Sequence, residues 1–317
     1  MRSRQHWRYY CPMENALLTV ASFCSIIALG FVVARTMKLP EGFTDTLSKI
    51  VFRFTLPAAI FHTFATSAFD ASYLVLALVG LACTFFPWLI GSLITWRESH
   101  DRRVLMMMNI SGFNIGCFVL PFAQALFPPG AALIVCLFDA GNALMMSGGT
   151  YAFSSAILDK NGSHMERAAL AAKRLLSSVP FDLYCILIIV FMLGFTVPDQ
   201  VIKFIEPLSN ANAFLAMFML GLMVQFSLGK GKTFQLVRLL ALRFILAAIM
   251  SALVVMFLPF DNMVIMVIVA LLWSPMGALG PVYTLWAKGD VGLAGFANVI
   301  TIVVGVIAMT AVALSML

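Results

Sequence analysis

Ten apolar stretches dominate this sequence, and each is long enough to cross a lipid bilayer as a helix. Such a helix needs about 20 predominantly apolar residues, because every backbone polar group must be paired within the hydrocarbon. The predicted spans cover residues 15–34, 46–65, 73–95, 105–126, 131–158, 179–197, 204–228, 236–258, 264–286 and 291–317. Hydrophobic residues make up 62% of the chain and charged residues 11%, which excludes a soluble fold. The sequence therefore predicts an all-α polytopic membrane protein of about ten transmembrane helices.

Lysine and arginine residues alternate between the two sides of these spans. The loops after the first, third, fifth, seventh and ninth spans hold fifteen of them, if Arg243 is counted in the loop after the seventh span. The other loops and the C-terminus hold only Lys203. Short loops rich in lysine and arginine stay in the cytoplasm. We therefore expect a multi-pass protein of the plasma (inner) membrane with both termini outside.

The first twelve residues depart from this pattern, because they place Arg2, Arg4 and Arg8 on the predicted outer side. One interpretation is that translation starts at Met13 and that the preceding stretch is an upstream extension; a start at Met1 is the alternative. A signal peptide is disfavoured, since no small-x-small cleavage site interrupts the first span.

The sequence contains no motif for metal, cofactor or ATP chemistry. Its six cysteines are scattered without CxxC spacing or a nearby histidine. HExxH, P-loop and GxSxG motifs are absent. The basic residues, although they give a net charge of +6, form no continuous face for nucleic acid. We therefore expect no enzymatic activity, no cofactor, no metal and no nucleic-acid partner. The expected surroundings of the chain are the lipid bilayer.

Glycine and proline interrupt two spans at corresponding places. The fourth span reads NISGFNIGCFVLP and the ninth reads LLWSPMGALGP. A proline inside a helix removes a backbone hydrogen bond at a cost of about 3 kcal/mol. Irregular backbone at membrane depth is tolerated only where it lines a cavity or is buried in protein. A simple proline kink explains one such cluster, but a matched pair favours the discontinuous helices of a transporter.

Five spans in each half make the second half enter the membrane in the opposite direction, so the chain is predicted to be an inverted repeat. The predicted units are an N-terminal extension (1–12), a first five-helix repeat (13–158), a cytoplasmic loop (159–178) and a second five-helix repeat (179–317).

Several short motifs together resemble the auxin efflux carrier family of membrane transporters. They are NIGCFVLP from Asn114 to Pro121, FRFTLPAAIF around Pro57, MFMLGLM in the seventh span, and SPMGALGP followed by Ala-Lys-Gly in the ninth. The resemblance covers nearly the whole chain from Met13, and it is specific as a set.

The resemblance implies a ten-helix fold shared with the bile acid sodium symporters, in which the fourth and ninth helices unwind and cross at the substrate site. It also implies a scaffold of helices 1, 2, 6 and 7 and a mobile core of helices 3 to 5 and 8 to 10. Bacterial members are similar to carriers of small organic anions such as malate or malonate. The candidate substrate-binding residues at the two interruptions are Asn114, Gly116, Pro121, Pro275, Gly277, Gly280 and Pro281.

Asp139 is the main candidate for ion coupling, because ionisable residues inside spans are rare and functional by default. It lies about 12 Å into the fifth helix, and Asn142 shares its face. With Asn114 they are expected to form a polar cluster that binds a proton or a sodium ion. The alternative is a carboxyl group that stabilises the helix crossing without titrating.

Three further ionisable residues lie near span ends or a proline. Arg53 and His62 flank Pro57, and either could contact an anionic substrate. The favoured alternatives are that Arg53 extends to the cytoplasmic lipid headgroups and that His62 is hydrogen-bonded within the helix packing. Asp182 begins the sixth span, where an acid complements the helix dipole.

The leading hypothesis is a secondary active transporter that moves a small organic anion by alternating access, coupled to protons or sodium ions. A sodium-coupled bile acid-type symporter, a channel, a receptor and an intramembrane enzyme are the alternatives. The oligomeric state is open between a monomer and a homodimer.

Overall fold

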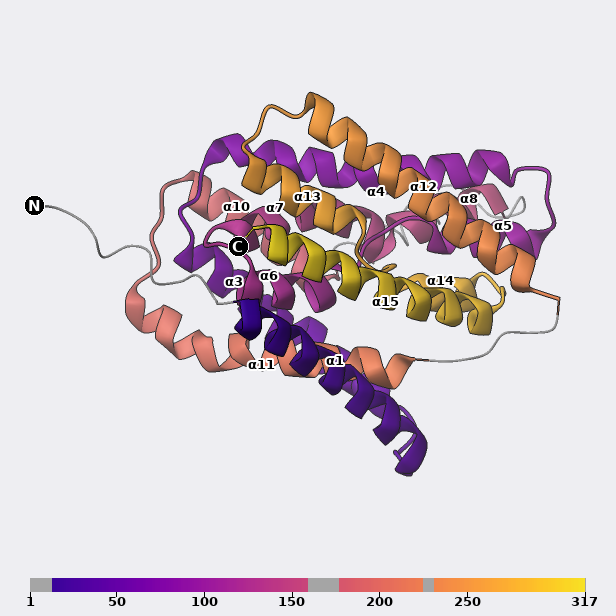
Figure 1. The fold of residues 1–317 in the computed structure, drawn as a ribbon, viewed down its shortest axis with the longest axis horizontal. Coiled ribbons are helices and arrows are strands. Elements are labelled where there is room, and N and C mark those ends of the chain that lie inside the picture. The colour runs from indigo at the N-terminus through magenta and orange to yellow at the C-terminus, as the bar shows by residue number, and fades with distance from the viewer. Residues whose placement is uncertain (1–12, 159–176, 225–230, 317) are drawn as a thin grey trace, which may run out of the picture.

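The computed structural model describes residues 13–158, 177–224 and 231–316. Predictions that concern residues 1–12, the start site and most of the loop 159–178 lie outside the described residues. Within the described part every regular element is a helix, and the chain runs as ten helical passes (Figure 1). The predicted all-α polytopic fold is confirmed.

The passes agree with the predicted spans to within a few residues at most ends. Passes 1 to 3 are α1 (Met13–Thr36), α2–η1–α3 (Phe43–Ile50, Val51–Thr55, Leu56–Thr66) and η2–α4 (Ala71–Leu74, Val75–Ile94). Passes 4 and 5 are α5–η3–α6 (His100–Asn109, Ile115–Val119, Leu120–Leu126) and α7–η4–α8 (Ala131–Leu144, Met145–Gly149, Thr150–Leu158). Passes 6 to 8 are α10 (Val179–Met192), α11 (Asp199–Met223) and α12 (Thr233–Phe257). Passes 9 and 10 are α13–α14 (Asn262–Leu272, Gly280–Trp286) and α15 (Val291–Ser315).

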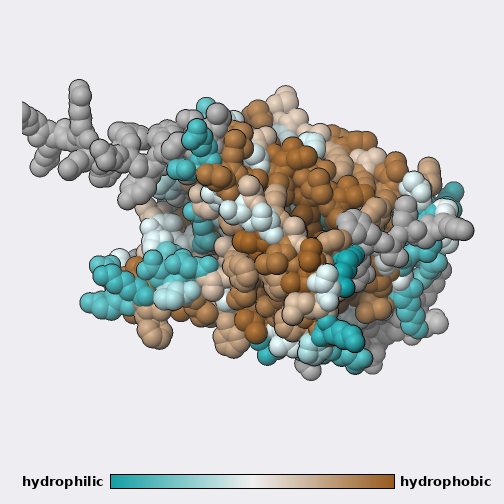
Figure 2. Space-filling model, turned by 60° about the horizontal axis from the view of Figure 1, so that its bottom comes forward, coloured by the Kyte–Doolittle hydropathy of each residue, from teal (hydrophilic) through white to brown (hydrophobic). Residues whose placement is uncertain are grey.

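Five of the passes contain a helix that is long and apolar enough to cross a membrane by itself. They are Glu14–Thr36, Ala71–Ile94, Ala131–Leu158, Thr233–Phe257 and Val291–Ser315. The other five are interrupted, shorter or more polar. The middle of one face of the molecule is covered by hydrophobic side chains, and hydrophilic ones gather toward its ends (Figure 2). Such a surface suits a protein surrounded by lipid.

The connections between passes gather at two opposite ends of the molecule (Figure 1). We call one of them the basic end, after the lysine and arginine residues that indicate orientation; it is defined by residues 37–42, 95–99 and 287–290, which contain Lys38, Arg97 and Lys288 together with Glu41, Glu98 and Asp290. The first turn of α1 and the last turn of α15 lie toward the opposite end. Some basic residues counted with the loops lie in helix ends, such as Arg102 in α5 and Arg238 in α12, and one assignment was wrong, because Arg243 is buried ten residues inside α12.

Close helix packing divides the passes into two groups. In one group α1 and α3 pack on α11, and α10 packs on α3; in the other α4 packs on α7, and α12, α13 and α15 pack on one another. Glycines allow the closest approaches: a Cβ added to Gly221 of α11 would lie 2.0 Å from the carbonyl oxygen of Ile27 in α1. One added to Gly141 of α7 would lie 1.8 Å from that of Ala77 in α4. Small residues at membrane helix interfaces permit such contacts.

The two interrupted passes cross each other at their breaks. Helix α5 ends at Asn109 and α13 ends at Leu272. Beyond these ends, Phe113 and Met276 form an antiparallel bridge, and the N–H of Asn114 donates to the carbonyl of Pro275 at 2.9 Å. The predicted breaks of the fourth and ninth spans are therefore present.

The prolines do not all mark the breaks themselves. Pro121 is the seventh residue of the continuous helix Ile115–Leu126, and Pro281 lies in the first turn of α14, beyond the break. Proline is favoured there, because the first N–H groups of a helix have no partner to lose. Pro121 and Pro57 each follow a π-helical turn, Ile115–Val119 and Val51–Thr55. Proline has no backbone N–H, so it cannot make the i to i−4 hydrogen bond of an α-helix. The wider π-helical turn before each of these prolines is therefore locally acceptable.

Candidate functional site

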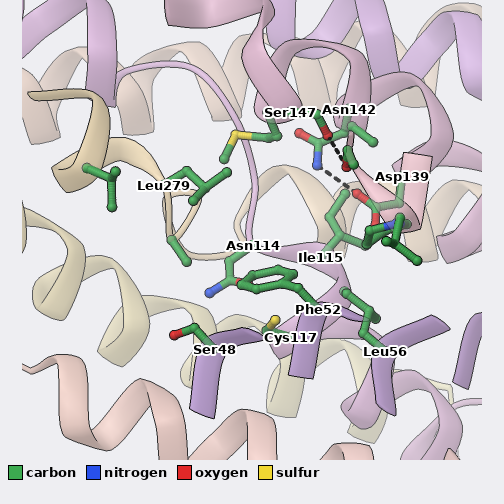
Figure 3. A pocket seen from close by; sticks show the side chains of 18 of the residues that line it. Ser48, Phe52, Leu56, Asn114, Ile115, Cys117, Asp139, Asn142, Ser147 and Leu279 are labelled. Carbon is green, nitrogen blue, oxygen red and sulfur yellow. Dashed lines mark hydrogen bonds between the residues drawn. The ribbon is translucent and has the colours of Figure 1, made fainter. Parts of the chain in front are cut away.

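A cavity of about 450 Å³ lies beside the crossing and contacts both interrupted passes. Its wall is formed by α2 and η1, the segment 113–117, α7, the start of α10, the end of α11 and the segment from Ala278 to Trp286. Figure 3 shows Asn114 and Ile115 at the crossing, with Ser48, Phe52 and Leu56 on one side and Asp139 with Asn142 on another. The cavity is thus bounded by both helix groups.

The cavity opens toward the basic end. The lining residues nearest that end are Asp45 and Lys49 in α2, which are exposed, and Trp286 at the end of α14, which is also exposed. Two other lining residues, Asn114 and Asp139, lie well inside the helical passes and are only 5% and 7% exposed. The mouth is therefore charged and exposed, and the floor is buried.

Aromatic packing closes the path from the floor to the opposite end. Phe122 of α6 lies 4.9 Å from Phe23 of α1 and 5.0 Å from Phe118, measured between ring centroids. Phe64 of α3 lies 5.8 Å from Phe191 of α10. All of these side chains except Phe191 are buried. The structure is therefore open at one end and packed at the other.

Asn114 ends the interruption of the fourth pass and lines the cavity. Its backbone N–H is used by Pro275, but its side-chain Nδ2 is buried and has no hydrogen-bond partner among the described residues. A buried donor without a partner is costly, so native proteins seldom leave one unused without reason. An acceptor on a bound molecule would satisfy it.

The helix that follows Asn114 adds further donors. Residues Ile115–Leu126 form one continuous helix of 12 residues, and its first three residues line the cavity. The first N–H groups of a helix lack intrahelical partners, and the helix dipole makes that end positive. Gly116 allows close approach, because an added Cβ would lie 2.8 Å from a Leu56 side-chain carbon. This end of the helix is suited to an anion.

Asp139 and Asn142 of α7 tie the cavity wall to the crossing. The Asn142 amide donates to the Asp139 carboxylate at 2.7 Å and to the carbonyl of Phe113 at 3.0 Å. Its oxygen accepts the N–H of Phe113 at 3.1 Å. One side chain therefore pairs both backbone groups of a residue inside the break. Asp139 and Asn142 are in contact, as their spacing predicts, and among the described residues no hydrogen bond joins the Asn114 side chain to them.

Tyr184 of α10 is a member of the site that the sequence did not reveal. Its hydroxyl donates to the second oxygen of Asp139 at 2.8 Å, and the residue is 1% exposed. Because α10 and α7 belong to different helix groups, this bond joins the two groups beside the cavity floor. A lone tyrosine in an apolar span carries no periodic signal, so only the packing of α10 on α7 identifies it.

The other predicted residues lie at different distances from the cavity. Arg53 is exposed and lines it. Ala278, Leu279, Val282 and Trp286 represent the ninth pass in the wall. Five predicted substrate-binding residues do not line the cavity: Pro121, Pro275, Gly277, Gly280 and Pro281.

Two of those glycines are needed for close packing at the crossing. An added Cβ at Gly277 would lie 2.0 Å from Met146, and one at Gly280 would lie 2.7 Å from Asn109 Oδ1. His62 is half-buried on α3 away from the cavity, and Asp182 lies in the first turn of α10.

The first half of the chain, residues 16–173, matches the family model described as membrane transport protein. The chain belongs to this family. The match agrees with the resemblance to auxin efflux carriers, and it identifies the chain as a membrane transport protein. None of the curated proteins compared with it matches.

Proposed function

We propose that this membrane transport protein carries a small organic anion across the plasma membrane by alternating access. The observation that carries the proposal is the pairing of an unsatisfied buried donor, Asn114 Nδ2, with the free N-terminus of the helix Ile115–Leu126, both at the floor of one cavity.

The charges around the cavity favour a carboxylate. Asp45, Lys49 and Arg53 lie toward the mouth; Lys49 is paired with Asp45, so Arg53 leaves a net positive charge there, which raises the local concentration of anions. At the floor, the oxygens of Asp139 already accept hydrogen bonds from Asn142 and Tyr184. The unpaired donors near the floor are the Asn114 side-chain N–H and the first N–H groups of the helix Ile115–Leu126.

The size of the cavity favours a small molecule. Ligand pockets commonly measure about 300–1,000 Å³, and the present cavity of about 450 Å³ lies at the lower end of that range. A short mono- or dicarboxylate such as malate or malonate is the proposed substrate class.

A carrier is favoured over a channel because the cavity is open at one end and closed by aromatic packing at the other. A channel requires a pore that is continuous in its conducting state. Two helix groups that meet at the cavity provide the moving parts for alternating access. With the basic end in the cytoplasm, the described state is inward-facing and both termini lie outside.

Coupling to an ion gradient is proposed to involve Asp139. It is a carboxylate at membrane depth, and its hydrogen bond to Tyr184 connects the two helix groups. A change in its protonation would change that connection.

Uptake into proteoliposomes tests the proposal. Labelled malonate and malate should accumulate saturably in vesicles that contain the protein, and the corresponding neutral diamides should not compete. Asn114→Leu, which keeps a similar volume without the donor, should raise the KM at least tenfold; Asn298→Leu on α15, away from the cavity, is the matched control. Failure of carboxylates to enter, with entry of a neutral or cationic solute instead, would contradict the proposal.

A further inference from the structure

Arg243 of α12 places a buried positive charge against the helix crossing. The residue is 4% exposed. Its guanidinium donates to the carbonyl oxygens of Ile110 at 2.9 Å, of Gly112 at 3.1 Å and of Ser274 at 3.2 Å. It also lies over the ring of Phe113, 5.1 Å from the centroid. All of its contacts here are therefore to the two broken segments.

These carbonyls belong to the negative ends of two half-helices. Ile110 and Gly112 follow the C-terminus of α5, and Ser274 follows the C-terminus of α13. The last carbonyls of a helix have no intrahelical partner, and the helix dipole makes that end negative. Two such ends that converge on one point form a position for a cation.

In secondary transporters with interrupted helices, unwound carbonyls and half-helix C-termini are the groups that coordinate a coupling sodium ion. Here one side chain already occupies such a position. A guanidinium keeps its charge at neutral pH and satisfies several acceptors at fixed geometry. A sodium ion entering beside it would meet a like charge at short range, in surroundings of low dielectric constant.

We propose that Arg243 takes the place of a coupling sodium ion, so that this carrier works without sodium. The proposal rests on the proposed function only in assuming that the crossing belongs to a carrier. Asp139, the acid at the crossing, already accepts one hydrogen bond on each oxygen, from Asn142 and from Tyr184. The driving force is then a proton gradient or the gradient of the anion itself.

Cation binding can be tested without any substrate. The thermal unfolding midpoint of the purified wild-type protein in detergent should be equal in sodium, potassium and N-methylglucamine chloride at the same ionic strength. Arg243→Gln exposes the carbonyls to solvent cations; its midpoint should fall and should be raised by sodium in a dose-dependent way. Arg238→Gln, the same change five residues earlier on α12 at the Glu98 contact, is the control and should show no sodium effect.

Transport provides the second readout. Wild-type uptake of malonate or malate should keep its rate within twofold when sodium is replaced by N-methylglucamine. A sodium-specific rise of the wild-type midpoint, or a loss of uptake without sodium, would overturn the proposal. So would a folded Arg243→Gln protein that does not respond to sodium. The wild-type measurements decide the question even if that variant does not fold. A protein that transports no carboxylate under any condition would instead contradict the proposed function.

Discussion

Replacing Asn142 by alanine should destabilise the protein more than almost any other single polar substitution in its interior. The side chain makes three hydrogen bonds, two to the backbone of Phe113 and one to Asp139. Side-chain hydrogen bonds in membrane proteins average about 0.6 kcal/mol, which gives about 2 kcal/mol for the three. The N–H and C=O of Phe113 would also be left buried without partners, at about 1 kcal/mol or more each. We expect a loss of about 2–4 kcal/mol in unfolding free energy.

Unfolding by sodium dodecyl sulfate in mixed micelles, followed by far-ultraviolet circular dichroism, measures this loss. Asn298→Ala is the matched control, because that buried asparagine accepts only a long contact of 3.5 Å from Thr301 through its side chain. The control should lose less than about 1 kcal/mol. An Asn142→Ala protein as stable as the control would refute the view that this side chain holds the break together.

Three further predictions follow from particular residues. Asp139→Asn should still bind and exchange substrate but should lose uptake driven by an imposed proton gradient, measured in proteoliposomes; equal gradient-driven uptake would leave Asp139 a structural role. A reporter fused after Leu317 should report the outer face and one inserted near Gly162 the cytoplasm; finding both on one side would contradict ten passes. Partial burial raises the pKa of Asp290, but hydrogen bonds from Lys232 and the backbone outweigh this and hold the pKa below its ordinary value. The stabilising contribution of Asp290 is then full above about pH 4 and is lost as the pH falls below the lowered pKa, so Asp290→Asn should reduce the thermal midpoint at pH 7 and converge with wild type in acid.

The passes could be predicted from sequence because the bilayer imposes one length and one composition on every span. The breaks could be predicted for a similar reason, since glycine and proline in matched spans leave few other structures. The exact position of the breaks could not. Pro121 lies inside the helix that starts at Ile115, and the chain leaves the preceding helix before Gly112, whose φ of 84° suits glycine.

The partners inside the site were harder to predict than its place. Asp139 and Asn142 share a helix face by their spacing, so their contact follows from local geometry. Tyr184 is separated from Asp139 by 45 residues, and Arg243 from Ile110 by 133. Such pairs depend on how distant helices pack, which periodicity does not encode. The available signal for Arg243 was a basic residue seven positions inside the predicted span 236–258, but this residue was counted with the preceding loop.

The central claim is that this protein is a carrier with a carboxylate site at the crossing, and counterflow tests it most directly. Proteoliposomes loaded with excess unlabelled malonate or malate, and then diluted into a trace of the labelled anion, should accumulate label transiently above equilibrium. The effect should saturate with internal substrate and should be strongly reduced in Asn114→Leu vesicles. Label that only equilibrates, at a rate that does not depend on internal substrate, would identify a channel and contradict this account.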